Sequence, residues 1–327
     1  MTEPLTVCTV SFNSAPYLRL NRRLGKALNP TADLRWIVAE NSPADSSARL
    51  EHGEPGFDII QGAGPGHIAS YHHTLALRSC IERADTRFVL VLDPDLFVIR
   101  RDWVATMLAH MQTRGLAILG VPWHPQSKGK YRYFPAVHFS IFDTAKFDKA
   151  AIDFLPDYPD GEHDPRWPEG WHPDRDYFAL STMARWLARL PQLKARRRHY
   201  TDTGSRLYKK FVTGDAIRFE VLDPVFDAER ERQRLSRAGR LLERVLPDEL
   251  CYVPKGYDGA NNAPFLSGIA GGETPKAWEQ FLWQSAPFCF HVRRNLGPAQ
   301  RGLGNELEIA ERIVDALVAR EASPTRA

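Results

Sequence analysis

Short apolar segments alternate with longer helical stretches over the first hundred residues, and this alternation limits the possible folds more than any other feature of the chain. We expect strands at residues 5–11, 36–39, 57–60 and 88–92, where apolar residues predominate. Helices are expected from the turn at Asn13–Pro16 to about residue 28, and over about residues 67–84. The continuous apolar run at 88–92 is typical of a strand that is buried on both faces. Strands and helices that alternate in this way predict a doubly wound α/β layer.

The remainder of the chain does not continue this regular alternation of strands and helices. We expect a strand at residues 136–142, then a loop at 153–176 that is dense in Pro, Asp, His and Trp, and a helix at 177–190. A connection of that length is typical of a functional loop. Further on, we expect an amphipathic helix at 228–246, a strand at 288–292 and a closing helix at about 306–322 with Asn305 as its N-cap.

Composition excludes several classes of protein. The 327 residues carry a net charge of only +3, whereas a nucleic-acid-binding protein usually concentrates a larger basic excess on one face. No apolar run approaches the roughly 18 residues of a membrane span, and the N-terminus lacks the cationic stretch of a secretory signal. The four cysteines lie far apart, without the spacing of a zinc or redox site. We therefore expect a cytoplasmic protein that does not bind nucleic acid.

Two carboxylates directly follow the buried strand at 88–92, in the sequence Asp93-Pro94-Asp95. At the end of such a strand they would project into the crevice where open α/β sheets bind ligands. Carboxylate oxygens suit Mg²⁺ or Mn²⁺, which share their coordination shell with substrate phosphates. A solvated turn is the alternative, because a chain of this composition contains roughly one or two such pairs by chance, and Asp174-Arg175-Asp176 is a second one. The position at a strand end favours the first pair.

Polar residues also end the first two strands. Thr9, Ser11 and Asn13 lie at the end of one strand and in the turn after it, and Glu40 and Asn41 lie at the end of the next strand. Hydroxyl, amide and carboxylate groups in these places are suited to hold a base or a ribose. Simple capping of the following helix, through the residue after Asn13, is the alternative explanation for the first group.

These residues together resemble the nucleotide-sugar half of a GT-A glycosyltransferase, and family 2 most closely. Enzymes of this kind begin with a strand like residues 7–13, continue with a strand that ends in an acidic-Asn-Ser turn like residues 38–42, and then have a glycine-bearing loop, a helix and a strand that ends in D-x-D. The order and spacing agree over about 100 residues. There are two departures: Glu40 stands where the family usually has Asp, and the helix carries His67, His72 and His73 in place of asparagines.

The resemblance implies a GT-A-type α/β fold, with a mostly parallel central sheet and helices on both faces. It also implies a division into a nucleotide-sugar-binding half (1–121), an acceptor-binding and catalytic half (122–300) and a C-terminal helix and tail (301–327). Within it, Asp93, Asp95 and His291 are implied as ligands of Mn²⁺ or Mg²⁺. Asp93 would also lie near the ribose. Thr9, Ser11, Asn13, Glu40 and Asn41 would bind the nucleoside.

The second half resembles the family less closely. His138-Phe139-Ser140-Ile141-Phe142 is similar to the strand beside the donor sugar, and residues 201–207 are similar to the segment that supplies the catalytic base. An inverting transfer needs a carboxylate to take the proton of the acceptor hydroxyl. We expect Asp202 to be this base, with Asp176 as its rival.

Two further segments carry candidate binding residues. The guanidinium of Arg293 or Arg294 suits the oxygens of a diphosphate leaving group. The loop at 163–176 offers tryptophan faces to an acceptor sugar, or it is an ordinary surface loop. The helix at 228–246 is expected to pack its apolar face and to expose arginines to solvent. Contact of this helix with an anionic membrane is the alternative.

The resemblance implies a hexosyltransferase-like enzyme of surface polysaccharide biosynthesis. It would move a sugar from a nucleotide-sugar donor to a glycan or lipid-linked glycan acceptor, with inversion, in the cytoplasm or at the inner face of the membrane. A sugar-phosphate nucleotidyltransferase is one alternative, although the loop after the first strand lacks the basic, glycine-rich sequence that such an enzyme uses. A non-catalytic relative that binds a nucleotide or a glycan is another.

Overall fold

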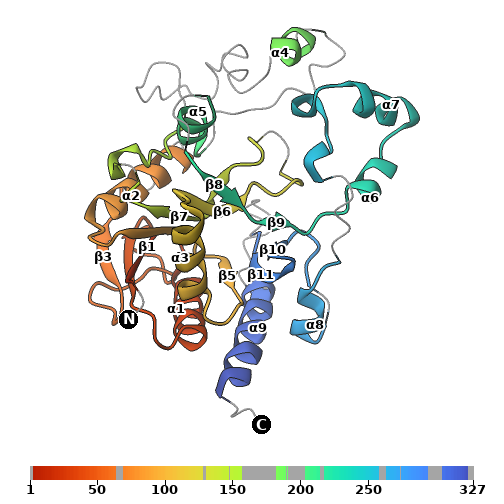
Figure 1. Ribbon diagram of the computed structural model, residues 1–327. Helices are drawn as coiled ribbons and strands as arrows, with labels where there is room; N and C mark the ends of the chain where they lie inside the picture. Colours follow the sequence, from red (N-terminus) through yellow and green to blue (C-terminus); the bar gives the residue numbers. More distant parts are fainter. Residues whose placement is uncertain are drawn as a thin grey trace.

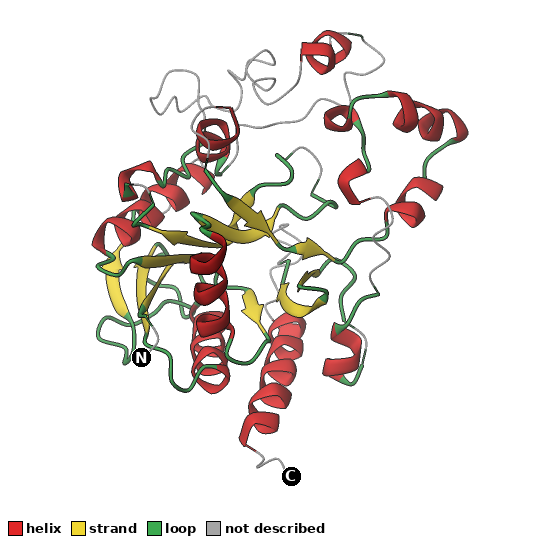
Figure 2. Cartoon of the chain, in the orientation of Figure 1, coloured by secondary structure: helices red, strands yellow, loops and turns green. Residues whose placement is uncertain are grey.

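The computed structural model describes residues 3–63, 69–127, 130–146, 148–156, 182–188, 190, 203–213, 217–257, 263–272, 274–293 and 304–322. Figures 1 and 2 show the arrangement of its elements. The first part of the chain contains β1 (Leu5–Ser11), α1 (Ala15–Leu28), β2 (Leu34–Glu40), β3 (Asp58–Gln61), α2 (Ala69–Arg83), β4 (Phe88–Leu92), β5 (Leu96–Val98), α3 (Trp103–Arg114), β6 (Ile118–Pro122), β7 (Pro135–Asp143) and η1 (Lys149–Ala151). The later part contains α4 (Thr182–Ala188), α5 (Ser205–Thr213), β8 (Phe219–Val221), β9 (Asp223–Pro224), α6 (Ala228–Gln233), α7 (Arg237–Val245), η4 (Asp248–Leu250), η5 (Lys255–Tyr257), α8 (Leu266–Ala270), β10 (Glu279–Trp283), β11 (Ala286–His291) and α9 (Gly304–Ala322).

The central sheet has the strand order β3-β2-β1-β4-β7-β6-β8 within the described residues. Neighbouring strands are parallel except where β7 pairs with β4 and with β6. A second, antiparallel sheet has the order β5-β11-β10-β9. The predicted α/β class with a mostly parallel central sheet is therefore confirmed.

Helices cover both faces of this sheet because its buried strands are apolar on both sides. Successive side chains of a strand point to opposite faces, so Leu5 and Val7 of β1 join one core, whereas Cys8 and Val10 join the other. Helices α1 and α3 pack on the first core, and α2 packs on the second. Helix α9 packs against α1 through a third cluster of buried residues.

The link between the two sheets positions the site. Strand β4 belongs to the central sheet and β5 to the small one, and residues 93–95 connect them. The amide of Asn21 in α1 holds this link, because its Nδ2 donates hydrogen bonds to the carbonyls of Pro94 (2.8 Å) and Leu96 (2.9 Å). The Asp-Pro-Asp segment is therefore a fixed corner rather than a solvated turn.

Two predictions of local structure are wrong. The segment 228–246 is not one helix, because it forms α6 and α7, which are capped separately by the side chains of Asp227 and Ser236. Helix α9 begins at Gly304, so Asn305 lies inside the helix rather than at its N-cap.

Only part of the expected helix at 177–190 falls within the described residues, as α4. None of the described helices is long and apolar enough to cross a membrane.

Candidate metal and nucleotide site

Three segments that are distant in sequence meet at the Asp-Pro-Asp corner. The backbone N–H of Asp93 donates a hydrogen bond to the carbonyl of His138 in β7 (2.9 Å), and the N–H of Val292 donates one to the carbonyl of Asp95 (2.9 Å). In the small sheet, His291 of β11 lies opposite Leu96 of β5. These pairings bring His138 and His291 beside the two aspartates.

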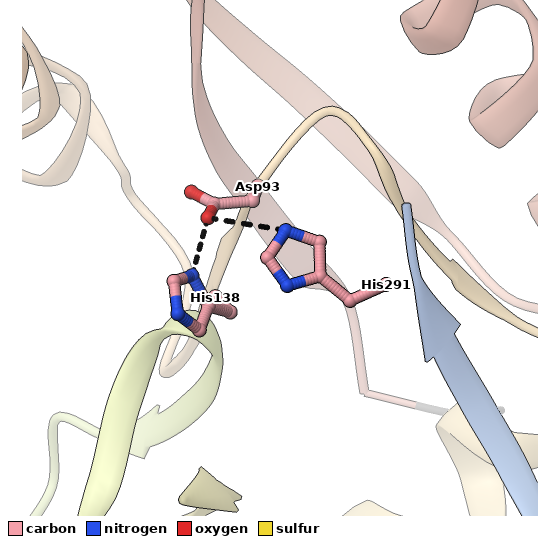
Figure 3. Close-up of side chains that lie close together, drawn as sticks. All are labelled: Asp93, His138 and His291. Carbon is pink, nitrogen blue, oxygen red and sulfur yellow. Dashed lines mark hydrogen bonds and ion pairs between the residues drawn. The ribbon is translucent and has the colours of Figure 1, made fainter. Parts of the chain in front are cut away.

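The side chains of Asp93, His138 and His291 converge (Figure 3). Nδ1 of His138 lies 2.5 Å from Oδ2 of Asp93, and Nε2 of His291 lies 3.9 Å from the same oxygen. Nε2 of His291 is also 3.3 Å from Oδ1 of Asp95. One possible ligand atom from each of Asp93, His138 and His291 lies within 4.8 Å of the other two. The predicted ligands Asp93, Asp95 and His291 therefore lie together, and the structure adds His138 to them.

A buried carboxylate supports His291 from behind. Oε2 of Glu279 lies 3.0 Å from Nδ1 of His291, which stands opposite it in the β10–β11 pair. The other oxygen of Glu279 accepts hydrogen bonds from Arg293 (2.7 Å) and Ser127 (3.2 Å). A carboxylate behind a histidine fixes the ring and directs its other nitrogen towards a metal. Glu279 holds Nδ1 of His291 in this way, so that Nε2 of the same ring faces the two aspartates.

The electrostatics keep Asp93 ionised. Burial raises the pKa of this carboxyl, but the charge and hydrogen bond of His138, followed by His73 and His291, outweigh burial and lower the pKa to about 2. Burial lowers the pKa of His138 more than Asp93 raises it. Because an ionised Asp93 can only accept, Nδ1–H of His138 donates the hydrogen bond between them. Its Nε2 is buried and has no hydrogen-bond partner in the described part of the chain.

His291 has the opposite behaviour. Burial lowers its pKa, but the hydrogen bonds to Asp95 and Glu279 raise the pKa to about 9. The pKa of Glu279, which burial alone would raise, is held well below its usual range by His291 and then by Arg293. Without a metal, a positive imidazolium therefore lies between two carboxylates.

These residues fit a divalent metal ion. Carboxylate oxygens with one or two imidazole nitrogens are suitable donors for Mn²⁺, and for Mg²⁺ when oxygen donors predominate. The imidazolium of His291 marks a place that already holds positive charge between Asp95 and Glu279. Loss of the Nε2 proton would turn this ring into a ligand while Nδ1–H still donates to Glu279.

Two positive side chains lie over the ring of Trp123, which packs against the cluster. The Trp123 ring lies edge-on to the His138 ring, with centroids 4.3 Å apart. Nζ of Lys130 lies 4.6 Å from the Trp123 ring centroid, and Cζ of Arg293 lies 5.9 Å from it. Burial, followed by the charge of Arg293, lowers the pKa of Lys130 to about 8. Arg293 thus contacts the Glu279 carboxylate directly, whereas Lys130 is connected to the cluster through the Trp123 ring.

The predicted nucleoside-binding residues lie along the same edge of the sheet. Ser11 of β1 stands opposite Glu40 of β2, and the N–H of Asn41 donates to the Ser11 carbonyl (2.8 Å). The hydroxyls of Thr9 and Ser11 are buried and have no hydrogen-bond partner within the described residues. Asn13 has a positive φ of 53°. The five residues Thr9, Ser11, Asn13, Glu40 and Asn41 therefore lie on two adjacent strand ends.

Hydrogen bonds within the chain already use some of these groups. The two oxygens of Glu40 accept hydrogen bonds from the N–H groups of Ser42 (2.8 Å) and Leu50 (2.9 Å), so this carboxylate holds the loop after β2. The hydroxyl of Ser14, at the N-cap position of α1, makes no cap bond and instead donates to the Phe12 carbonyl (2.8 Å). Capping by Ser14 therefore does not account for the polar residues at the end of β1.

Several predicted residues lie outside the described residues. These are the candidate bases Asp202 and Asp176, the loop at 163–176, and His67 and Arg294. Sequence reasoning missed Glu279. It predicted that His138 lies beside the donor sugar, and it did not predict the contact between His138 and Asp93. Polar residues within otherwise apolar strands were the signal for both residues.

Comparisons with known proteins give weak structural likenesses. The mannosyltransferase PcManGT from Pyrobaculum calidifontis, in complex with GDP-Man and Mn²⁺, is 12% identical with a TM-score of 0.36 over 47% of this chain and 48% of that one. S. aureus TarS 1-349 in complex with UDP is 16% identical with a TM-score of 0.35, and the match covers 46% of this chain and 50% of that one. The galactosyltransferase LgtC, in complex with donor and acceptor sugar analogues, is 14% identical with a TM-score of 0.41 over 96% and 95% of the two chains. The chain thus spans about half the length of the first two structures. No family model matches the chain, and no curated protein is similar to it in sequence.

Proposed function

We propose that this chain is a GT-A-type glycosyltransferase that uses a divalent cation, Mn²⁺ or Mg²⁺, to transfer a sugar from a nucleotide-sugar donor to a hydroxyl acceptor. The observation that carries the proposal is the convergence of Asp93, Asp95, His138 and His291 at one strand edge. The ends of β1 and β2 belong to the same parallel set as β4 and supply polar groups at that edge. Open α/β sheets bind ligands at this edge.

Asp93, Asp95 and His291 would hold the ion, with His138 against Asp93 and Glu279 behind His291. When bound, the ion supplies positive charge that stabilises the departing nucleoside diphosphate. Arg293 is held by Glu279 and by the hydroxyl of Ser127 (2.7 Å), which keeps its guanidinium close to the same place. Lys130 and Arg293 would then bind phosphate oxygens.

Other side chains would bind the nucleoside and supply the catalytic base. The buried hydroxyls of Thr9 and Ser11, with Asn13 and Asn41, would hold the nucleoside, while Glu40 orders the loop after β2. In an inverting transfer, Asp202 would take the proton of the acceptor hydroxyl as the oxygen attacks the anomeric carbon, with Asp176 as the alternative base. The nucleoside of the donor would bind within residues 1–121, whereas the acceptor and the catalytic groups would belong to residues 122–300.

The acceptor class and the location follow from the resemblance to family 2. We place the enzyme in the cytoplasm or at the inner face of the membrane, acting on a surface glycan or its lipid-linked precursor. The low net charge gives no reason to add a nucleic-acid partner.

A thermal-shift panel of UDP-, GDP-, dTDP- and CMP-sugars, each with and without Mn²⁺, tests the proposal. A donor present at 100 times its dissociation constant should add about 2.7 kcal/mol to the free energy of unfolding. We expect one donor to stabilise the protein only when Mn²⁺ is present, and Mn²⁺-dependent release of nucleoside diphosphate from that donor. Asp95→Ala should abolish both effects.

Asp85→Ala is the matched control, because Asp85 lies before β4, at the opposite end of that strand from Asp93, and is exposed. Donor binding that needs no metal and leads to no release would favour a non-catalytic binding protein. Release of pyrophosphate from a nucleoside triphosphate and a sugar phosphate would favour a nucleotidyltransferase. Either result would overturn the proposal.

A further inference from the structure

Helix α7 exposes apolar side chains that its sequence pattern predicted to be buried, and it buries a carboxylate instead. Its leucines and valine were expected to pack inwards, yet the side chain of Leu241 is 63% exposed and that of Val245 is 67% exposed. The residue that faces inwards is Glu243, which is 3% exposed. The carboxylate of Glu243 accepts hydrogen bonds from the N–H groups of Tyr252 and Val253, both at 3.0 Å. These two bonds fix the rotation of α7, so its apolar stripe faces solvent.

Arginines border this apolar stripe. Arg237 lies four residues before Leu241, and Arg244 lies three residues after it, so both share the exposed side of α7 with Leu241. Both arginines are exposed. Between residues 228 and 246 the chain has six arginines against three glutamates, so this short segment carries an excess of +3, which equals the net charge of the whole protein.

A basic hollow of about 390 Å³ lies beside this stripe. It is lined by Glu229, Arg232, Arg240, Glu243, Arg244 and Lys255. Helix α4, which contacts η4 after α7, also exposes two large apolar residues, Met183 (59%) and Trp186 (64%). In Figure 1, α6 and α7 lie at the side of the molecule away from α1 and the N-terminus.

We infer that α7 and its flanking arginines dock on an anionic membrane surface. An exposed apolar patch marks an interaction site. An amphipathic helix whose apolar side chains are bordered by arginines binds such a surface by burying those side chains at the headgroup level while the cations contact lipid phosphates. A second copy of the chain is a poorer occupant, because a twofold contact through this face would place the same arginines opposite one another.

Vesicle sedimentation tests this inference and needs no nucleotide, so its result is independent of the proposed transferase activity. The full chain is mixed with vesicles of phosphatidylcholine alone, or of an equimolar mixture of phosphatidylcholine and phosphatidylglycerol. We expect at least about tenfold more protein to sediment with the anionic vesicles, and we expect the difference to shrink in about 1 M salt, where the screening length is about 3 Å.

Two variants separate the contributions of charge and apolar contact. Arg237→Glu with Arg244→Glu should abolish binding to anionic vesicles, and Leu241→Ser with Val245→Ser should reduce it about tenfold. All four side chains are exposed, so we expect unchanged melting temperatures. The charge-matched control is Arg312→Glu with Arg320→Glu on the exposed side of α9, which should bind like the wild type.

Three results would overturn the inference. One is a lack of preference of the wild type for anionic vesicles, and another is an equal loss of binding in the control variant. The third is a dimer, detected by light scattering, that Leu241→Ser with Val245→Ser dissociates, because this face would then join two copies of the chain. If the serine variant fails to fold, the glutamate pair decides between these outcomes.

Discussion

Replacement of Glu279 by Gln should weaken Mn²⁺ binding without removing a metal ligand. The Glu279 side chain is only 2% exposed. One of its oxygens lies 3.0 Å from Nδ1 of His291, and the other lies 2.7 Å from the guanidinium of Arg293. An amide has one acceptor oxygen, so in Glu279→Gln one of these donors meets an N–H group instead. Removal of the carboxylate behind a ligating histidine costs about 10- to 100-fold in metal affinity, or about 1.4 to 2.7 kcal/mol.

The gain in unfolding free energy on adding Mn²⁺ measures this loss. At a concentration 100 times the wild-type dissociation constant, Mn²⁺ should stabilise the wild type by about 2.7 kcal/mol. The same concentration should stabilise Glu279→Gln by about 1.4 kcal/mol if affinity falls tenfold, and by about 0.4 kcal/mol if it falls 100-fold. Each protein is compared with itself in chelator, so a change in metal-free stability does not enter the comparison.

Glu220→Gln is the matched control. Glu220 also pairs with a histidine, since its carboxylate lies 3.0 Å from Nε2 of His110, but neither residue belongs to the metal cluster. This variant should keep the full response to Mn²⁺. An undiminished response in Glu279→Gln, or an equal decrease in both variants, would refute the role given to Glu279.

Three other predictions concern the cluster, the base and the sheet. His138→Gln should weaken Mn²⁺ binding about tenfold in a direct metal titration, because Asp93 loses its imidazole partner; an unchanged affinity would remove His138 from the site. Asp202→Asn should lower the rate of sugar transfer about 10²- to 10⁴-fold and leave the dissociation constant of the donor unchanged. If transfer persists in this variant and is lost in Asp176→Asn, then Asp176 is the base. Gly120→Ala should lower the free energy of unfolding in urea by about 1–3 kcal/mol, because a methyl group there would overlap the Phe139 carbonyl of the adjacent strand; unaltered stability would show that β6 and β7 can separate.

The sheet could be predicted because its signal is local. The predominance of apolar residues in β1 and the apolar run of β4 are readable from a few consecutive residues, and the second places Asp93 at a strand end without knowledge of the rest of the fold. His291 was also implied as a ligand, and the structure places it beside both aspartates. Local periodicity and the resemblance thus located three members of the cluster.

The other members depend on strand pairing that spans long stretches of sequence. His138 meets Asp93 only because β7 runs antiparallel to β4, and Glu279 meets His291 only because β10 pairs with β11 in that register. The local pattern does not set either pairing. The orientation of α7 could not be predicted for a similar reason, because the bonds from Glu243 to the backbone at 252 and 253 fix its rotation against the pattern of its leucines.

The most direct test of the account is the anomalous scattering of manganese in crystals soaked with Mn²⁺ and the nucleoside diphosphate of the preferred donor. The account predicts one strong peak bonded to Asp95 and His291 with Asp93 alongside, and diphosphate oxygens that complete its coordination. A nucleotide bound elsewhere, with no manganese peak at these side chains, would contradict it.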